Sequence, residues 1–311
     1  LHTLNLSHNQ IFHVDRNSFD TLDGLQSLDL ADNRIEELSG IVFLSLKKLQ
    51  TIDLSNNPIH QLPLGIFANQ LQLSALHMDN TNIIRLSNWI DSITNSTINQ
   101  QILSNLKHVS LRNSTNLRHI ESCFFFNLPQ IERLFITESR NLTFLPRGME
   151  AMSQLIELDV SNNKLEFIPE GLKHLSNLKV LNLLNNQFLC DCQMFWMLGW
   201  IDELNAINKT LPNDLLRLSE LNCRNGYPGD MMRILHHINC VKPYLIYSTI
   251  DQQYEIFSDA ILECRFAGSP APQIVWRTPT GTILKYYENN EKDKDAKFQL
   301  DLHHRSVLEN T

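Results

Sequence analysis

The residues with the clearest capacity for chemistry are the six cysteines, and two of them stand one residue apart. Cys190 and Cys192 lie in the stretch FLCDCQMFWMLGW, and the other four are Cys123, Cys223, Cys240 and Cys264. A Cys-x-Cys pair can supply two metal ligands, act as a redox pair, or send each cysteine to a different disulfide partner. A disulfide within the pair is geometrically poor, because one intervening residue leaves little freedom for the required dihedral angle. Zinc satisfies the ligand count, with the candidate ligands Cys190, Cys192, Cys223 and Cys240.

The sequence contains none of the common catalytic motifs. It has no nucleophile elbow, no phosphate-binding loop and no His-Glu-x-x-His motif, and its 10 glycines form no phosphate-cradling cluster. The histidine pairs His236–His237 and His303–His304 have no carboxylate or cysteine neighbours at ligand spacing. We therefore expect no catalytic site and no cofactor in this chain.

Composition narrows the class of partner. The 311-residue chain is 42% hydrophobic and 19% charged, as in folded globular proteins, and its net charge of −8 argues against nucleic acid as a partner. The longest apolar run, Met194 to Ile201, is far shorter than the ~20 residues that span a bilayer. Residue 1 already lies within a repeat, so we interpret the chain as a fragment cut at its N-terminus.

The elements that position the cysteines follow a repeat with a period of about 24 residues. LHTLNLSHNQI at residue 1 returns as LQSLDLADNRI at 25, LQTIDLSNNPI at 49, LIELDVSNNKL at 155 and LKVLNLLNNQF at 178. Degenerate copies begin at Leu73, Leu106 and Ile131, which makes eight repeats. The ninth positions are Asn9, Asn33, Asn57, Thr81, Ser114, Ser139, Asn163 and Asn186. The template is L-x-x-L-x-L-x-x-N-x-L, the leucine-rich repeat pattern.

Each part of the template has a physical role. Positions 4 and 6 flank a short strand and point into a core that only stacked repeats can bury. The Asn at position 9 can bond backbone groups of adjacent turns, and the shorter Thr81, Ser114 and Ser139 should satisfy fewer of them. A second apolar column is expected to be core packing: Phe19, Phe43, Phe67, Phe125, Met149 and Leu172. The 33-residue step between Thr81 and Ser114 inserts residues within 88–101, either as a convex loop or as a bend that shapes a binding site.

The chain after Cys192 has the composition of a cap. The open end of a solenoid needs a cover, and the apolar helix expected there suits burial on more than one side. This run resembles the C-terminal flanking cap of extracellular leucine-rich repeat proteins. The resemblance implies disulfides Cys190–Cys223 and Cys192–Cys240, no metal, and a location outside the cytosol. Cys123 has no obvious partner, and we expect it to be a free buried thiol.

The last part of the chain resembles another extracellular module. Cys264 and Trp276 are separated by Gly268-x-Pro270-x-Pro272 and are similar to the B and C strands of an intermediate-set immunoglobulin domain. The second cysteine of such a domain does not occur before Thr311. We therefore expect Cys264 to be unpaired and the domain to be cut at its C-terminus.

Together these features resemble the leucine-rich repeat and immunoglobulin cell-surface family, which includes Kekkon-like, LINGO-like and AMIGO-like proteins. The same order of modules also resembles peroxidasin and the neurotrophin receptor kinases. The resemblance implies an α/β leucine-rich repeat solenoid with a curved parallel sheet (1–187), a disulfide-stapled C-terminal cap (188–241) and a partial all-β immunoglobulin sandwich (242–311). It implies a membrane-anchored receptor, co-receptor or adhesion ectodomain that binds a protein ligand or a second copy of itself. Two alternatives stay open: the recognition portion of a haem peroxidase or receptor kinase whose catalytic domain lies outside this chain, and a structural matrix component.

Solenoid curvature makes the strand face concave, and positions 2, 3, 5, 7 and 8 of each repeat point onto it. The sequence places an acidic spot at Asp29 and Asp53, joined by Asp32. It places a basic spot of Lys107, Arg112 and Arg133 around an exposed Phe135, which has the composition of an interface hot spot. The alternative is an ordinary mixed solvated face. Glycosylation motifs suit a secreted chain and begin at Asn5, Asn95, Asn113, Asn141 and Asn208.

Overall fold

The computed structural model describes residues 1–87, 103–126, 128–206, 220–224, 230–248, 264–269, 275–277 and 283–285. The chain divides into two compact units, Leu1–His237 and Ile238–Thr311. The insertion predicted within 88–101 lies outside the described residues, as do the side chain of Cys123 and the glycosylation motifs at Asn95 and Asn208.

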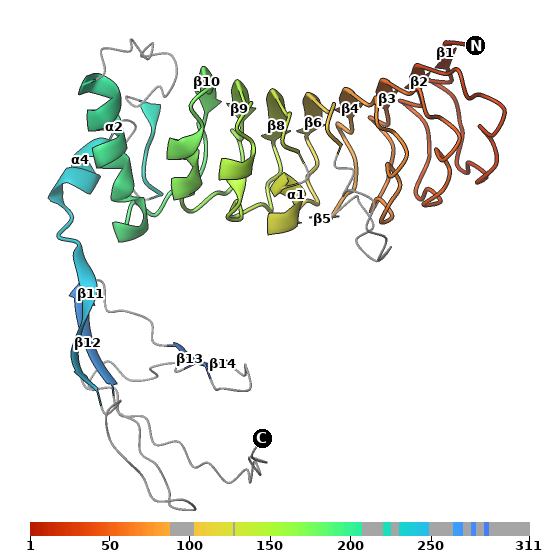
Figure 1. The fold of residues 1–311 in the computed structure, drawn as a ribbon. Helices are drawn as coiled ribbons and strands as arrows, with labels where there is room; N and C mark the ends of the chain where they lie inside the picture. Colours follow the sequence, from red (N-terminus) through yellow and green to blue (C-terminus); the bar gives the residue numbers. More distant parts are fainter. Residues whose placement is uncertain are drawn as a thin grey trace, which may run out of the picture. The chain divides into compact units, whose positions relative to one another are not determined.

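The first unit is a solenoid built on an eight-stranded parallel sheet in the order β1-β2-β3-β4-β6-β8-β9-β10, one strand for each predicted repeat. Figure 1 shows the strands in a row along one side, with the return segments on the other. The strands are β1 (Thr3–Asn5), β2 (Ser27–Asp29), β3 (Thr51–Asp53), β4 (Ala75–His77), β6 (His108–Arg112), β8 (Arg133–Thr137), β9 (Glu157–Asp159) and β10 (Val180–Asn182).

Strand register follows the sequence template. Position 4 of each repeat pairs with position 4 of the next, so that Leu28 lies beside Ile52 and Ile52 beside Leu76. From β2 to β10 these position-4 side chains are all buried. The predicted aromatic column is also core: the ring of Phe43 stacks on Phe19 at 6.2 Å and on Phe67 at 6.0 Å between centroids.

The asparagines at position 9 bond the backbone as the sequence predicts. The Nδ2 of Asn57 donates to the carbonyls of Leu30, Leu54 and Ser55, and its Oδ1 accepts from the N–H of Ile35 at 3.0 Å. Thr81 reaches one carbonyl, that of Met78, at 3.0 Å. The buried hydroxyl of Ser139 has no hydrogen-bond partner. The middle repeats therefore lack part of the internal bonding of their neighbours.

Position 8 of every repeat adopts the left-handed backbone conformation. The φ angles lie between 54° and 58°, at His8, Asp32, Asn56, Asn80, Asn113, Glu138, Asn162 and Asn185. Asn and Asp tolerate this region better than other side chains with a Cβ. The conformation turns the chain away from the sheet, and the N–H at position 8 donates to the neighbouring turn, as Asn56 does to Asp79 at 2.8 Å.

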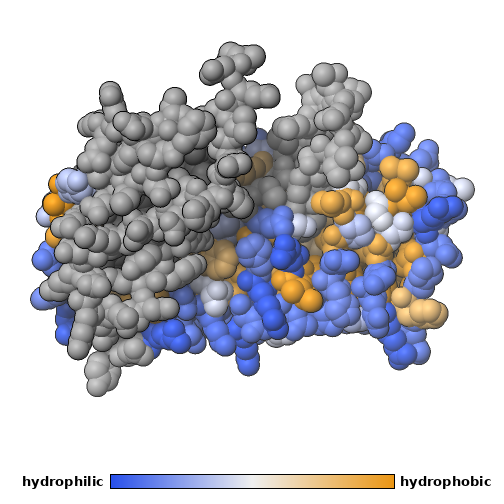
Figure 2. Space-filling view, turned by 90° about the horizontal axis from the view of Figure 1, so that it is seen from below, coloured by the Kyte–Doolittle hydropathy of each residue, from blue (hydrophilic) through white to orange (hydrophobic). Residues whose placement is uncertain are grey.

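The return segments are mostly turns, with short regular elements in the later repeats. A two-stranded parallel sheet joins β5 (Arg85–Leu86) to β7 (His119–Ile120). The helical segments are α1 (Ser122–Phe126), η1 (Met149–Ala151) and η2 (Glu170–His174). Seen from the loop side, the surface of the N-terminal repeats mixes polar with apolar groups (Figure 2), and exposed apolar side chains in these segments include Ile41, Leu44 and Leu64.

The C-terminal end of the solenoid carries a disulfide-bonded cap. It contains η3 (Cys192–Met194), α2 (Trp196–Ala206) and α4 (Met231–His237), and α2 packs against both η2 and α4. Met194, Met197 and Trp200 are buried, whereas Leu198 and Ile201 are half-buried. The apolar helix is thus covered most fully on one face.

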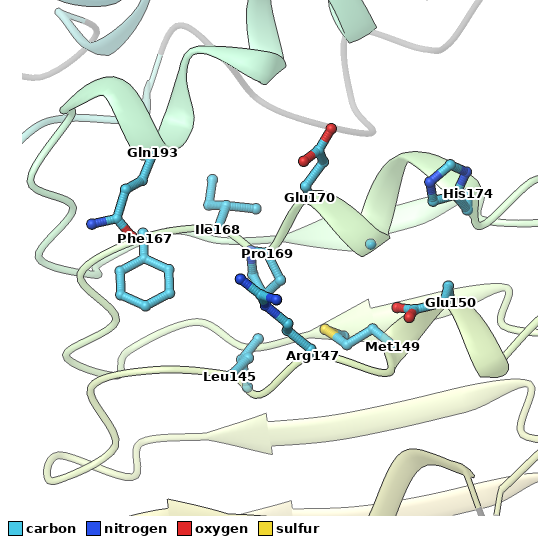
Figure 3. A pocket seen from close by; sticks show the side chains of 11 residues that line it. Leu145, Arg147, Met149, Glu150, Phe167, Ile168, Pro169, Glu170, His174 and Gln193 are labelled. Atoms are coloured by element: carbon cyan, nitrogen blue, oxygen red, sulfur yellow. The ribbon is translucent and has the colours of Figure 1, made fainter. Parts of the chain in front are cut away.

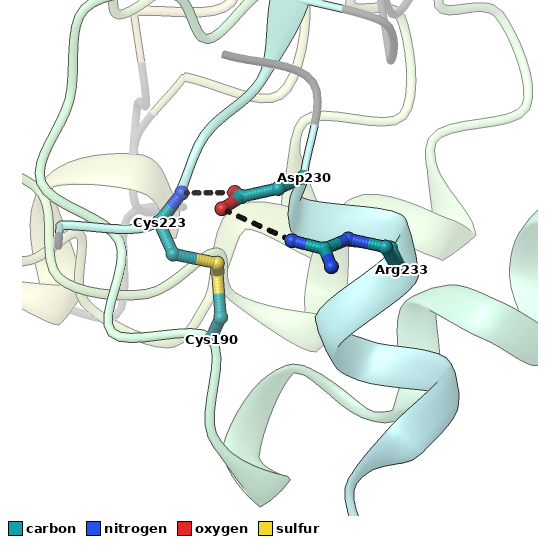
Figure 4. Close-up of a disulfide and its surroundings, with 4 residues drawn as sticks. All are labelled: Cys190, Cys223, Asp230 and Arg233. Atoms are coloured by element: carbon teal, nitrogen blue, oxygen red, sulfur yellow. Dashed lines mark hydrogen bonds and ion pairs between the residues drawn. A yellow bond between two sulfur atoms is a disulfide. The ribbon is translucent and has the colours of Figure 1, made fainter. Parts of the chain in front are cut away.

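A disulfide joins the start of the cap to a later segment of it. Cys190 and Cys223 are bonded, with a Cα–Cα distance of 5.7 Å, and a β-bridge pairs Phe188 with Cys223. The buried carboxylate of Asp230 accepts from the N–H of Cys223 at 3.3 Å and faces Arg233 (Figure 4). Cys192 and Cys240 are disulfide-bonded as well.

The described residues of the second unit form two separate antiparallel strand pairs. β11 (Val241–Ser248) pairs with β12 (Cys264–Ser269), and β13 (Val275–Arg277) pairs with β14 (Ile283–Lys285). Cys264 begins β12 and Trp276 lies in β13, the residues that the sequence assigns to strands B and C. A complete sandwich stays a prediction of the sequence.

Candidate functional site on the sheet face

The candidate site lies on the outward face of β4, β6 and β8, at the centre of the eight-stranded sheet. Alternate residues of β6 point outward, so His108, Ser110 and Arg112 share this face. The register places Ser110 beside Phe135 of β8 and beside His77 of β4. The sheet thus brings together the basic residues and the aromatic residue that the sequence selects.

Phe135 is not the exposed aromatic that the sequence predicts. Its side chain is 6% exposed, because the guanidinium of Arg112 lies over the ring at 4.3 Å from the centroid. The ring of His108 covers another part, with the two centroids 5.3 Å apart. Phe135 is therefore a support beneath Arg112 and His108, and a ligand would meet those two side chains first.

The predicted basic spot is partly neutralised. Lys107 forms an ion pair with Glu132 at 2.8 Å, and Arg133 lies 3.7 Å from a carboxylate oxygen of Glu157. Both acidic partners come from the next strand or the residues just before it. Arg112 differs, since within the part of the chain that the structure describes its guanidinium has no acidic partner at ion-pair distance.

A histidine row continues the site towards β4. The rings of His77 and His108 lie 4.9 Å apart between centroids. The pKa of His108 is lowered to about 4: burial contributes most, the neighbouring His77, Arg133 and Arg112 add to the effect, and Asp79 opposes it. His108 is therefore neutral at physiological pH, and the row His77–His108–Phe135–Arg112 joins aromatic side chains to the guanidinium of Arg112.

Sequence reasoning missed His108 and Asp79 as parts of this site. Asp79 lies beside the row, where its Oδ1 accepts from the Ser110 hydroxyl at 2.6 Å and from the Arg112 N–H at 2.7 Å. His108 could have been found because it occupies position 3 of the fifth repeat, which places it on the strand next to that of Phe135. Reading position 5 alone along the stack passes over it.

The predicted acidic spot has a structural component. The Oδ1 of Asp29 accepts from the N–H of Ala31 at 3.0 Å, and Asp53 makes the same bond to Ser55 at 2.9 Å. Each carboxylate thus closes the turn that follows its own strand. Asp32 lies 3.4 Å from the imidazole of His8. The spot is acidic, but part of its hydrogen-bonding capacity is already used.

Three of the five glycosylation motifs fall on described residues, and all three asparagines are exposed. Their side chains have local partners: Asn5 accepts from Ser7, Asn113 donates to Asn80, and Asn141 donates to the carbonyl of Thr115 at 2.8 Å. Asn113 also has a left-handed backbone, with φ of 55°. Glycosylation of these residues stays a prediction.

A hollow among the described residues lies away from this face, between the return segments of the last repeats and the cap. It measures about 660 Å³, and Figure 3 shows Arg147 in its middle, with Phe167 and Gln193 to one side and Glu150 to the other. Glu150 accepts from the Gly148 N–H at 3.2 Å. The walls of this hollow combine apolar side chains with acidic and basic ones, and this mixture favours no single ligand chemistry.

No group of three or more His, Cys, Asp or Glu side chains among the described residues is arranged to hold a metal ion. None of the helices formed by these residues has the length and apolar character that crossing a membrane requires.

Comparisons with known proteins agree with the repeat architecture. The family described as Leucine rich repeat matches residues 1–59, 23–83 and 129–188, so the chain carries leucine-rich repeats. The NT-3 growth factor receptor of Gallus gallus is 23% identical over 184 residues, which are 58% of this chain and 21% of that receptor. The chain therefore spans about a fifth of that relative's length.

Solved structures also match parts of this chain. Human 5T4, also named Wnt-activated inhibitory factor 1 or trophoblast glycoprotein, has a TM-score of 0.50 at 20% identity, over 77% of this chain and 85% of that one. The Drosophila Toll–Spatzle complex has a TM-score of 0.39 at 22% identity, over 64% of this chain and 32% of that one. The likeness to 5T4 shows the fold alone.

Proposed function

We propose that this chain is part of an extracellular recognition protein that binds another protein on the sheet face of β4, β6 and β8. The observation that carries the proposal is the row His77–His108–Phe135–Arg112, which joins aromatic surface to a cation without an acidic partner among the described residues. Aromatic and Arg side chains are the residue types enriched where protein interfaces are strongest.

The cap supports the location. A disulfide joins Cys190 to Cys223, and disulfides persist in oxidising compartments outside the cytosol. We further infer that Cys192 pairs with Cys240. Our proposed domain limits are 1–187 for the repeats, 188–241 for the cap and 242–311 for a partial immunoglobulin domain with an unpaired Cys264.

Among the variants of this function, we favour the ectodomain of a membrane-anchored receptor, co-receptor or adhesion protein. The similarity to a growth factor receptor supports the receptor form. We infer that glycans on the exposed asparagines limit the usable surface.

A binding screen tests the proposal. The secreted chain is presented to an array of secreted and cell-surface ectodomains that includes the chain itself, and the affinity of each captured partner is measured by surface plasmon resonance. The double variant His108→Ala/Arg112→Gln should weaken binding at least tenfold. Arg118→Gln is the matched control, because Arg118 is exposed and lies after the turn that ends the strand segment. Equal binding by wild type and the double variant would place the interface elsewhere.

A further inference from the structure

The side chain of Arg112 is held in place before any partner arrives. Its guanidinium stacks on Phe135, 4.3 Å from the ring centroid. The backbone N–H of Arg112 donates to the Oδ1 of Asp79 at 2.7 Å, which fixes the main chain from which the side chain extends. Phe135 is itself 6% exposed and lies beside its strand neighbours, so it cannot turn away freely. An arginine fixed in this way loses less conformational freedom when it forms a hydrogen-bonded pair than a free surface arginine does.

The other cations of the site are already engaged. Glu132 lies 2.8 Å from Lys107, and Glu157 lies 3.7 Å from Arg133. The nearby carboxylate of Asp79 uses its Oδ1 on two donors, the Ser110 hydroxyl and the Arg112 N–H. Arg112 is therefore the cation of this face whose planar donor fork stays open to a ligand, within the residues that the structure describes.

The surface beside Arg112 is aromatic. Because burial and nearby positive groups keep His108 deprotonated, its imidazole adds no positive charge next to Arg112, and the ring of His77 lies beyond it, 4.9 Å away between centroids. Such a row suits an apolar or aromatic side chain, whereas a polyanion would gain most from several adjacent cations. The face thus offers one place for a negative charge with an apolar place next to it.

We propose that Arg112 binds an Asp or Glu side chain of the protein partner and that an apolar or aromatic residue close to that carboxylate lies on the His77–His108 row. A carboxylate matches the planar guanidinium in a two-point hydrogen-bonded pair. This inference rests on the proposed function and adds to it the chemistry of the partner.

The test selects peptides without assuming their sequence. A library of random displayed 12-residue peptides is panned on the full immobilised wild-type chain and, in parallel, on Arg112→Gln and on Arg118→Gln. Peptides enriched on wild type and on Arg118→Gln but not on Arg112→Gln should contain Asp or Glu next to an apolar residue. Absence of such enrichment would overturn the proposal.

A double-mutant cycle then isolates the pair. Replacing the selected Glu by Gln in a synthetic peptide with blocked ends should weaken binding to wild type about tenfold and to Arg112→Gln less than twofold. Arg112→Lys, which keeps the charge and loses the planar fork, should give an intermediate loss. Equal losses on wild type and Arg112→Gln would show that the carboxylate does not meet Arg112. The melting temperatures of the Arg112 variants should equal that of wild type, because Arg112 is exposed, and this control shows that a loss of binding is not a loss of folding.

Two further outcomes separate this inference from the proposed function. If a captured ectodomain loses affinity with His108→Ala but not with Arg112→Gln, the face binds a protein and the carboxylate inference is wrong. If a heparin-derived oligosaccharide binds in an Arg112-dependent way and no acidic peptide does, the ligand is a sulfated glycan and the inference is wrong as well. A partner insensitive to both variants contradicts the proposed function itself.

Discussion

Replacing Asn57 by Ala tests how much of the solenoid's stability comes from the position-9 asparagines. Asn57 is 1% exposed, and its amide serves three carbonyls and one N–H across two adjacent repeats. The substitution leaves the N–H of Ile35 without its acceptor in a region where Ile35 is fully buried. It also removes donors from the carbonyls of Leu30, Leu54 and Ser55.

The expected loss can be estimated from these bonds. An orphaned buried N–H costs about 1–3 kcal/mol, and the weakened satisfaction of the carbonyls adds about 1 kcal/mol. The total of roughly 3 kcal/mol corresponds to a fall in melting temperature of about 6–12 °C for a unit of this size. Asn57→Asp keeps the acceptor for Ile35 but loses the donors, and it should also destabilise.

Asn9 provides the matched control. It occupies the same position in the first repeat, but it is exposed and bonds the carbonyls of Leu6 and Ser7 alone. Asn9→Ala should lower the melting temperature by no more than about 2 °C, because water can replace an exposed bond. Thermal unfolding followed by circular dichroism measures both variants. Equal losses at Asn9 and Asn57 would refute the claim that buried bonding between repeats sets the cost.

Three other predictions concern different parts of the chain. Glu138 has a φ of 57°, which glycine adopts more easily, so Glu138→Gly should raise the free energy of unfolding by about 1 kcal/mol. Asn162 has the same conformation but a side chain that tolerates it, so Asn162→Gly should change that free energy by only about 0.3 kcal/mol. Denaturant titration compares the two variants. The folded-state pKa of His108 is lowered to about 4, so the unfolded chain binds the proton first as the pH falls. The stability that His108 contributes should therefore be constant above pH ~6.5 and fall by about 1–2 kcal/mol towards pH ~4, a modest loss because solvent partly screens this half-exposed ring. The variant His108→Gln should flatten this part of the stability profile. Replacing both Cys190 and Cys223 by Ser should lower the free energy of unfolding by about 4 kcal/mol, because the bridge closes a loop with a sequence separation of 33. The variant is compared with wild type in the absence of reductant. An unchanged stability would show that the bridge does not hold the cap.

Much of the fold could be predicted because the repeat is a local pattern. Each strand, its inward residues and the position-9 asparagine occur within 11 successive residues, so one copy specifies the bonding of Asn33 or Asn57. The left-handed turn at position 8 was not among the predictions, although Asn, which tolerates that conformation, occupies the position in most repeats. The arrangement after the last repeat depends on contacts between distant segments, and periodicity gives no information on those.

The candidate site was predicted less well, because alternation along a strand gives the face of a residue and not its exposure. Phe135 was assigned to the correct strand face, but the long side chain of Arg112 on the adjacent strand covers it. The basic spot was overestimated for a related reason. Glu132 and Glu157 occupy the same template positions as Lys107 and Arg133 one repeat later, and parallel register makes equal positions neighbours. Charges counted by register would have found both ion pairs.

The repeats that carry the candidate site are the same repeats that depart from the template inside the solenoid. His77, His108 and Phe135 belong to the fourth, fifth and sixth repeats, whose ninth positions are Thr81, Ser114 and Ser139. Position 9 faces the interior and the site faces outward, so the site's chemistry does not require the loss of Asn. The substitutions leave Ser139 with an unsatisfied hydroxyl, a local cost that neighbouring regular repeats must offset. Sequences that specify a fold usually break its local rules at functional positions. The fourth to sixth repeats therefore combine an irregular interior with Arg112, which has no acidic partner among the described residues. This coincidence favours their part of the sheet as the proposed binding site.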